Sequence, residues 1–160
     1  MKFEHLVEIN DFNNPLITEI SREQLWRGLV MRAEMPILFM PYIDECTITE
    51  RTELSMQRRL RYGELVVIDQ VNLVHMQHIH YQVPAQNEIT ESSLRMTIEE
   101  PSPGSLFVRF VYDDGQNAEQ DAANEMLNDY RSSAYHQADI DTVSMIRELA
   151  ETGRLDALPS

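Results

Sequence analysis

The sequence predicts an α+β domain in which an antiparallel sheet wraps around one long helix near the C-terminal end. Two alternating segments, 92–100 and 105–112, are joined by the turn Pro101-Ser102-Pro103-Gly104 and predict a hairpin. After an acidic break at 113–115, residues 118–152 contain no glycine or proline and show helical spacing. A hairpin that leads into so long a helix is expected to pack against it, with a cavity between the two.

Composition limits the class of protein. A chain of 160 residues with 42% apolar content suits one domain, residues 1–160, with a real core. A net charge of −14 argues against nucleic-acid and anionic-membrane partners, because both require a basic surface. A single cysteine, Cys46, excludes an internal disulfide and fits a reducing compartment. The chain has neither a long apolar run nor a signal-peptide pattern, so we expect a cytoplasmic protein.

The N-terminal part predicts one strand and two helical pieces. Apolar residues alternate with polar ones from Phe3 to Ile9, which is typical of a half-buried strand. Ser21 and Gln24 have the form of a capping box, and apolar residues then recur at helical spacing until Pro36 ends the helix. Residues 36–41 are too few for a full helix and predict a short helical turn.

From Cys46 onward the pattern has a period of two. Short linkers such as Gly63-Glu64 favour antiparallel hairpins. The predicted strands are 45–52, 55–62, 65–74, 78–83, 92–100 and 105–112. In the last helix the expected inward stripe leaves Asp139 outside it. Its members are Leu127, Tyr130, Ala134, Ala138, Thr142, Met145 and Leu149.

Four segments resemble a known family: residues 3–10, 22–29, 99–107 and 134–143. On these residues the sequence is similar to the AtaL-like family of the START, birch-pollen-allergen and polyketide-cyclase superfamily, called SRPBCC. The resemblance implies a helix-grip fold, with a seven-stranded antiparallel sheet around a long C-terminal helix and two short helices after strand 1. It implies a single START/birch-pollen-allergen-like domain with a deep cavity open to small hydrophobic molecules. It implies no specific activity, although fungal relatives in natural-product pathways lend some support to cyclase-like work.

The sharpest local prediction comes from strand register. A two-residue turn at Gly63-Glu64 places Arg58 opposite Asp69, and a three-residue loop at 53–55 places Arg58 opposite Glu50. The apolar neighbours of these residues predict that this face points inward. Arg58 between two carboxylates is either a satisfied ion network that fixes register or an anchor for a ligand carboxylate or enolate. In the second interpretation one of the two carboxylates is the general base.

Other candidate residues are assigned from their expected places around the cavity. Flexible methionine side chains line adaptable apolar sites well, and they also fill ordinary cores. His5 on the inward face of the first strand is more typical of a hydrogen-bonded core histidine than of an acid or base. The predicted ligand contacts are His5, Met40, Met56, Arg58, Phe110, Tyr130 and Met145.

Neither a metal site nor a cofactor is predicted. His78 and His80 share one strand face, but His75 falls on the other face and no cysteine lies nearby. The chain has no glycine-rich phosphate-binding motif. Cys46 follows two acidic residues, which disfavour a thiolate, so it is expected to be a small core residue.

Three functions are consistent with the sequence. The first is binding of a small hydrophobic ligand, lipid- or polyketide-like, between the sheet and the last helix. The second is a cyclase or dehydratase acting on a polyketide or aromatic intermediate, with Glu50, Arg58 and Asp69 as the candidate catalytic group. The third is a protein-interaction module, in which the outer face of the last helix meets a basic partner or a second copy of the chain in a homodimer. No catalytic motif in the sequence decides whether the protein is an enzyme.

Overall fold

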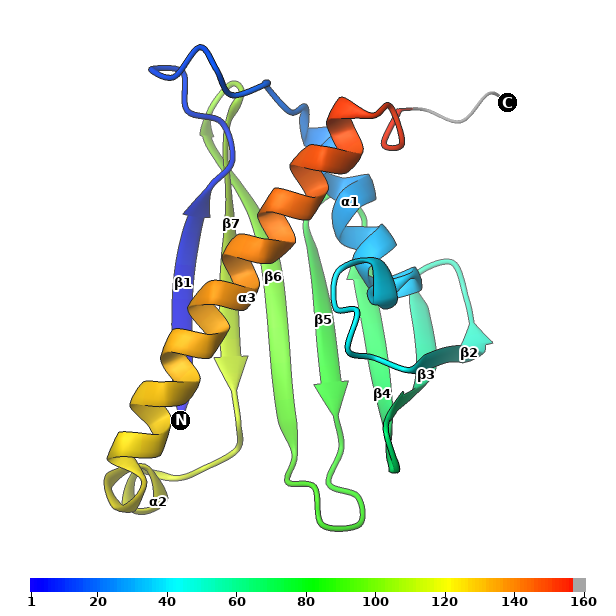
Figure 1. Ribbon diagram of the computed structural model, residues 1–160, viewed down its shortest axis with the longest axis vertical. Coiled ribbons are helices and arrows are strands. Elements are labelled where there is room, and N and C mark those ends of the chain that lie inside the picture. The colour runs from blue at the N-terminus through cyan, green and yellow to red at the C-terminus, as the bar shows by residue number, and fades with distance from the viewer. Residues whose placement is uncertain (157–160) are drawn as a thin grey trace.

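A computed structural model describes residues 1–156, and its elements follow the predicted order (Figure 1). Strand β1 is followed by helix α1, a short 3-10 helix η1, six further strands and two consecutive helices. The bounds are β1 Lys2–Glu8, α1 Arg22–Glu34, η1 Pro36–Leu38, β2 Glu45–Arg51, β3 Ser55–Tyr62, β4 Leu65–Val74, β5 His78–Val83, β6 Ser92–Ser102, β7 Ser105–Asp113, α2 Ala118–Ala123 and α3 Glu125–Glu151.

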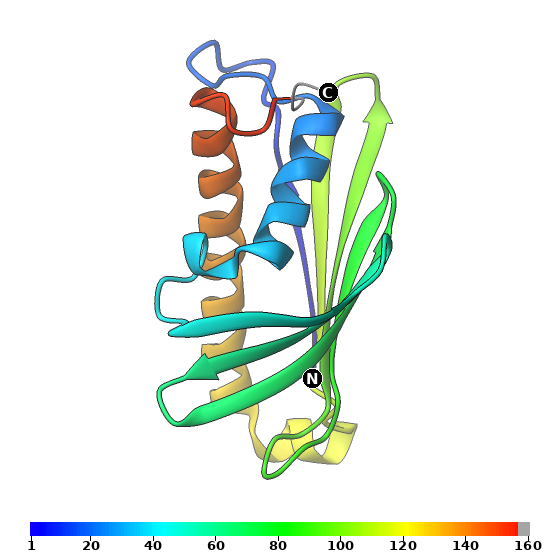
Figure 2. The same ribbon diagram turned by 90° about the vertical axis from the view of Figure 1, so that its right-hand side faces the viewer.

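The strands form one seven-stranded antiparallel sheet in the order β1-β7-β6-β5-β4-β3-β2. The first strand therefore pairs with the last one, and β2 forms the other edge. Helices α1 and α3 lie on one face of the sheet, and β2 to β4 curl toward that face (Figures 1 and 2). The predicted helix-grip fold is confirmed.

The register of β3 and β4 is the predicted one. Arg58 lies opposite Asp69 and Leu60 lies opposite Val67, because Gly63 adopts a φ of +63° that a tight two-residue turn requires.

The predicted register of β2 and β3 is wrong. A bulge between Ile48 and Glu50 leaves Thr49 without a partner, so Arg58 lies opposite Ile48 and Glu50 lies opposite Gln57. Thr49 instead donates its hydroxyl to the carbonyl oxygen of Gln57 at 3.2 Å. Glu50 is exposed and forms no part of an interior network.

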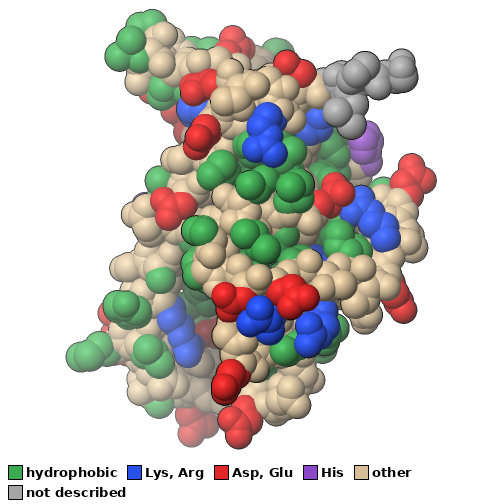
Figure 3. Space-filling view, turned by 45° about the vertical axis from the view of Figure 1, so that its right-hand side comes forward, with side chains coloured by type: hydrophobic (Ala, Val, Ile, Leu, Met, Phe, Trp, Pro, Cys, Tyr) green, Lys and Arg blue, Asp and Glu red, His purple; other side chains and the backbone are tan. Residues whose placement is uncertain are grey.

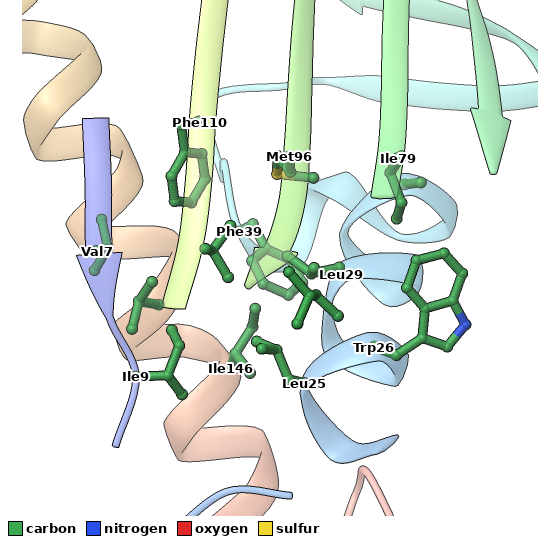
Figure 4. Packing of buried hydrophobic residues seen from close by; sticks show 14 of the residues in the cluster. Val7, Ile9, Leu25, Trp26, Leu29, Phe39, Ile79, Met96, Phe110 and Ile146 are labelled. Carbon is green, nitrogen blue, oxygen red and sulfur yellow. The ribbon is translucent and has the colours of Figure 1, made fainter. Parts of the chain in front are cut away.

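The core forms where α1 and α3 meet above the sheet. The Ser21 hydroxyl accepts the Gln24 N–H at 3.1 Å in the predicted capping box, which fixes the start of α1. A Cβ added at Gly28 would lie 2.8 Å from Ile146, so the two helices approach closely only because Gly28 has no side chain. Figure 4 shows Leu25 and Leu29 of α1 beside Ile146 of α3, below Phe110 and Met96 from the sheet.

The last helical segment differs from the prediction in two respects. It is interrupted at Asn124, which separates α2 from α3. The inward face of α3 is also rotated from the expected stripe: Leu127 is 48% exposed and Tyr130 is 75% exposed, whereas Asp139 is 1% exposed. Periodicity alone missed this face because Asp139 satisfies its carboxylate inside the protein, as the next section describes.

Among the described residues, no helix is both long enough and apolar enough to cross a lipid bilayer.

Candidate functional site

Arg58 and Asp69 form a closed ion pair inside the sheet. Arg58 donates from Nε and Nη2 to the two carboxylate oxygens of Asp69 at 2.9 and 2.5 Å, and from Nη1 to the carbonyl oxygen of Ala33 at 2.9 Å. Both side chains are buried. A bidentate pair of this kind satisfies most donors of the guanidinium, so little of Arg58 is left for a ligand.

Tyr81 on β5 contacts both Arg58 and a second buried arginine, Arg32 of α1. The guanidinium carbons of Arg58 and Arg32 lie 5.0 and 5.2 Å from the centroid of the Tyr81 ring, which is cation–π distance. Arg32 donates from Nε to the hydroxyl of Thr142 at 3.3 Å and contacts the sulfur of Met40 from Nη2 at 3.9 Å. Among residues 1–156 Arg32 forms no ion pair with a carboxylate.

Asp139 lies one helical turn before Thr142 and holds a second polar cluster together. Its carboxylate accepts a hydrogen bond from the Tyr112 hydroxyl of β7 and lies 3.2 Å from Nδ1 of His5 on β1. The His5 ring stacks on His136 with a centroid distance of 4.0 Å, and Tyr112 stacks on Tyr135. His5 is therefore half-buried and hydrogen-bonded, as the sequence predicts.

Together these side chains cross the interior from one half of the sheet to the other, and we call them the polar belt. Its members are Arg58, Asp69, Tyr81, Arg32, Thr142, Asp139, Tyr112 and His5.

The interior shifts the acid–base equilibria of the second cluster. Burial raises the pKa of Asp139, although the hydrogen bonds from Tyr112 and His5 act in the opposite direction. Burial and the neighbouring Asp139 raise the pKa of Tyr112, so its hydroxyl stays protonated and donates. Asp139 is thus a carboxyl group that holds its proton more readily than a solvated one.

The predicted ligand contacts other than His5 and Arg58, which are described above, fall into three groups. Met40 and Met145 are half-buried and pack against the core, so they lie where a movable lining is expected. Met56 and Phe110 are fully buried core residues. Tyr130 faces solvent, so the expectation that it points inward is wrong.

His78, His80 and Cys46 are not members of the polar belt, although Tyr81 on the same strand as the two histidines is. His78 and His80 are half-buried on β5, and burial together with Arg95 lowers the pKa of each imidazole. Within residues 1–156, no group of three or more histidine, cysteine or acidic side chains is arranged to hold a metal ion. Burial raises the pKa of the half-buried Cys46 thiol, which is unfavourable for a nucleophile.

Several surface hollows surround the interior. One of about 590 Å³ lies beside α1 and is lined partly by Trp26, Val30, Met31 and Met35. Figure 3 shows hydrophobic side chains gathered across the middle of one face, above a group of acidic and basic side chains. Other hollows of about 400 and 390 Å³ lie at the end of β5 and at the start of α3. Neither Arg32 nor Asp139 lines any of these hollows, and both side chains are buried.

Residues 7–153 match the model of the family described as AtaL, acetylaranotin biosynthesis cluster protein L. The chain belongs to the AtaL family. No curated protein matches the chain in sequence.

Solved structures share the fold of this AtaL-family protein at low sequence identity. The Zhui aromatase/cyclase from Streptomyces sp. R1128 is 15% identical with a TM-score of 0.60, over 94% of this chain and 93% of that one. The di-domain aromatase/cyclase StfQ from the steffimycin pathway is 10% identical with a TM-score of 0.68, over 96% and 51%. Human STARD10 is 12% identical with a TM-score of 0.62, over 97% and 66%. These likenesses establish the fold.

Sequence reasoning missed the members of the polar belt that come from α1, β5, β7 and α3. Arg32 does follow Leu25 and Leu29 at spacings of seven and three residues, on the buried stripe of α1. An arginine on such a stripe is a usable signal, because a charge rarely occurs there without a partner or a role. Tyr81 and Asp139 gave no comparable signal, since their partners come from distant parts of the chain.

Proposed function

We propose that this AtaL-family protein binds a small, mostly apolar molecule between α3 and the concave face of the sheet. The observation that carries the proposal is the composition of that interior. A few buried polar groups are set among apolar side chains that pack on the core but are only half-buried, such as Met40, Leu94 and Met145. Small-molecule sites have this composition, with an apolar lining and a few placed polar groups.

The comparisons support the same proposal. The fold is shared with aromatase/cyclases and with a START protein, and the family is described by a biosynthesis cluster. In our proposal a ligand reaches the covered interior by displacing flexible side chains. Methionine suits that task because its unbranched thioether repacks easily.

Bound material tests the proposal directly. The protein is purified gently and measured by native mass spectrometry, and any retained molecule is released by denaturing extraction and identified. Met145→Trp, which fills the half-buried position on α3, should abolish retention. Met126→Trp on the same helix is the matched control, because Met126 is 87% exposed. Absence of any retained or added apolar ligand in the wild-type protein would contradict the proposal.

A second candidate, a cyclase or dehydratase, is favoured by the Asp139 cluster. A general base is most effective when its pKa lies near the pH at which the enzyme works. The pKa of an ordinary carboxylate lies below that range, and burial raises the pKa of Asp139 toward it. In this proposal Asp139 removes a proton from a carbon next to a ligand carbonyl, and Tyr112 and His5 orient it. Glu50 is excluded from this role by its exposed position, and Asp69 is held by Arg58. Asp139→Asn should abolish turnover of a poly-β-ketone test substrate while leaving its binding intact.

A further inference from the structure

Two neighbouring members of the polar belt, Arg32 of α1 and Tyr81 of β5, have incomplete hydrogen bonding. The Tyr81 side chain is only 5% exposed, and its hydroxyl makes no hydrogen bond of good geometry, although it lies close enough to the Arg32 guanidinium to interact with that charge. Arg32 is 7% exposed, and among the described residues its one hydrogen bond of good geometry to an oxygen goes to the neutral hydroxyl of Thr142. An unpaired donor and an unpaired charge are both unfavourable in a protein interior.

Arg58 shows what a satisfied guanidinium looks like in the same interior. It lies over the same tyrosine ring, yet three of its nitrogens donate to oxygen, and two of these bonds go to one carboxylate. Arg32 lacks the equivalent of Asp69. In the place where a carboxylate could sit, its Nη2 contacts the thioether of Met40 at 3.9 Å. A thioether is a weak acceptor and does not compensate a buried charge.

We infer that Arg32 and Tyr81 bind the carboxylate of an otherwise apolar ligand, and that this carboxylate displaces the Met40 thioether. The planar guanidinium matches a planar carboxylate in two parallel hydrogen bonds, and the Tyr81 hydroxyl donates a third. The inference rests on the proposed function and adds the chemical class of the ligand to it. The sequence analysis offered Arg58 as the anchor for a ligand carboxylate, and this inference assigns that role to Arg32.

The direct test uses a matched pair of probes, 2-naphthoate and its methyl ester, measured by isothermal titration calorimetry. The two have the same ring system, but only the acid carries the charge. Wild-type protein should bind the acid at least about tenfold more tightly than the ester. Arg32→Met should weaken acid binding roughly ten- to a hundredfold and leave ester binding within about twofold.

Two further variants guard against misfolding and against a general charge effect. Tyr81→Phe keeps the ring over both arginines and removes only the hydroxyl, so it should weaken acid binding while the fold is retained. Arg59→Met is the control, because Arg59 lies on the same strand as Arg58 but on the opposite face of the sheet, and it should change neither affinity.

The outcomes separate this inference from the proposed function. Equal affinity for acid and ester in the wild-type protein, unchanged by Arg32→Met, would overturn the carboxylate site and leave apolar binding in place. Binding of neither probe would count against both.

A ligand-free experiment tests the displacement of Met40. Met40→Glu brings a carboxylate to the position of the thioether. Met40→Glu should therefore stabilise the protein that retains Arg32. In the Arg32→Met background the same substitution should destabilise the protein. The same loss of stability in both backgrounds would mean that no carboxylate fits beside Arg32.

Discussion

Arg58 and Arg32 lie in the same interior and over the same tyrosine ring, but their surroundings are opposed. Arg58 is held by a carboxylate of the next strand and by the carbonyl oxygen of Ala33. Arg32 meets one hydroxyl and a sulfur atom. In the first arrangement all three guanidinium nitrogens already donate, so none is left for a ligand. We call this ion pair of Arg58 and Asp69 the brace, because it links β3 and β4. The second leaves donors free, and the difference separates a structural charge from one that is available to a ligand.

The largest expected effect comes from breaking the brace. Arg58→Leu leaves Asp69 buried without a partner, so it should lower the free energy of unfolding by roughly 3–5 kcal/mol. The additional substitution Asp69→Leu should recover most of this loss, because no charge is then left unpaired. Urea unfolding of the single and double variants measures both effects. A single variant as stable as the wild type would refute the structural role of the pair.

The close approach of α1 and α3 brings Arg32 to Thr142, and Gly28 permits it. Gly28→Ala places a methyl group against the buried Ile146 and should cost roughly 1–3 kcal/mol despite the better helix propensity of alanine. Combining it with Ile146→Ala should show a favourable coupling in a double-mutant cycle. Strictly additive losses would mean that the two helices are not in the contact described.

A smaller effect distinguishes the two buried tyrosine hydroxyls. Tyr81→Phe removes an unpartnered hydroxyl and should raise the free energy of unfolding by about 1 kcal/mol in the ligand-free protein. Tyr112→Phe removes the donor to Asp139 and should lower it by about 1 kcal/mol or more. Opposite signs in chemical unfolding support the account. A loss of stability in Tyr81→Phe would indicate that its hydroxyl already has a partner.

The Asp139 cluster makes the stability of the protein depend on pH. Because the folded-state pKa of Asp139 is raised above its ordinary value of 3.8, the folded protein binds this proton more readily than the unfolded chain does. Its contribution to stability is therefore largest below that value and is lost as the pH rises through the raised pKa. Compared with Asp139→Asn, the wild-type protein should lose stability over that range. A rise over the same range would mean that the hydrogen bonds outweigh burial.

The pairing of β3 with β4 could be predicted from the sequence, because it depends on one short turn. The turn at Gly63 fixes the pairing of Arg58 with Asp69, and both are close in sequence. The bulge at Thr49 escaped prediction because alternation continues across it with only a change of register.

The rest of the site depends on distant packing. Arg32 reaches a hydroxyl 110 residues away, and His5 reaches Asp139 across 134 residues. No local pattern contains that information. The exposed side chains of Leu127 and Tyr130 also imitate an inward stripe, which is why the face of α3 was misassigned.

The most direct test of the contrast between the two arginines is thermal unfolding with and without 2-naphthoate. Arg32→Met should change the ligand-free stability by no more than about 1 kcal/mol, or roughly 2–4 °C, since it removes a charge that has no carboxylate partner. Added acid should raise the midpoint of the wild-type protein through mass action and leave that of Arg32→Met unchanged. If Arg32→Met is as destabilising as Arg58→Leu, or if its midpoint still rises with the acid as in the wild type, then Arg32 is a second brace and the account is wrong.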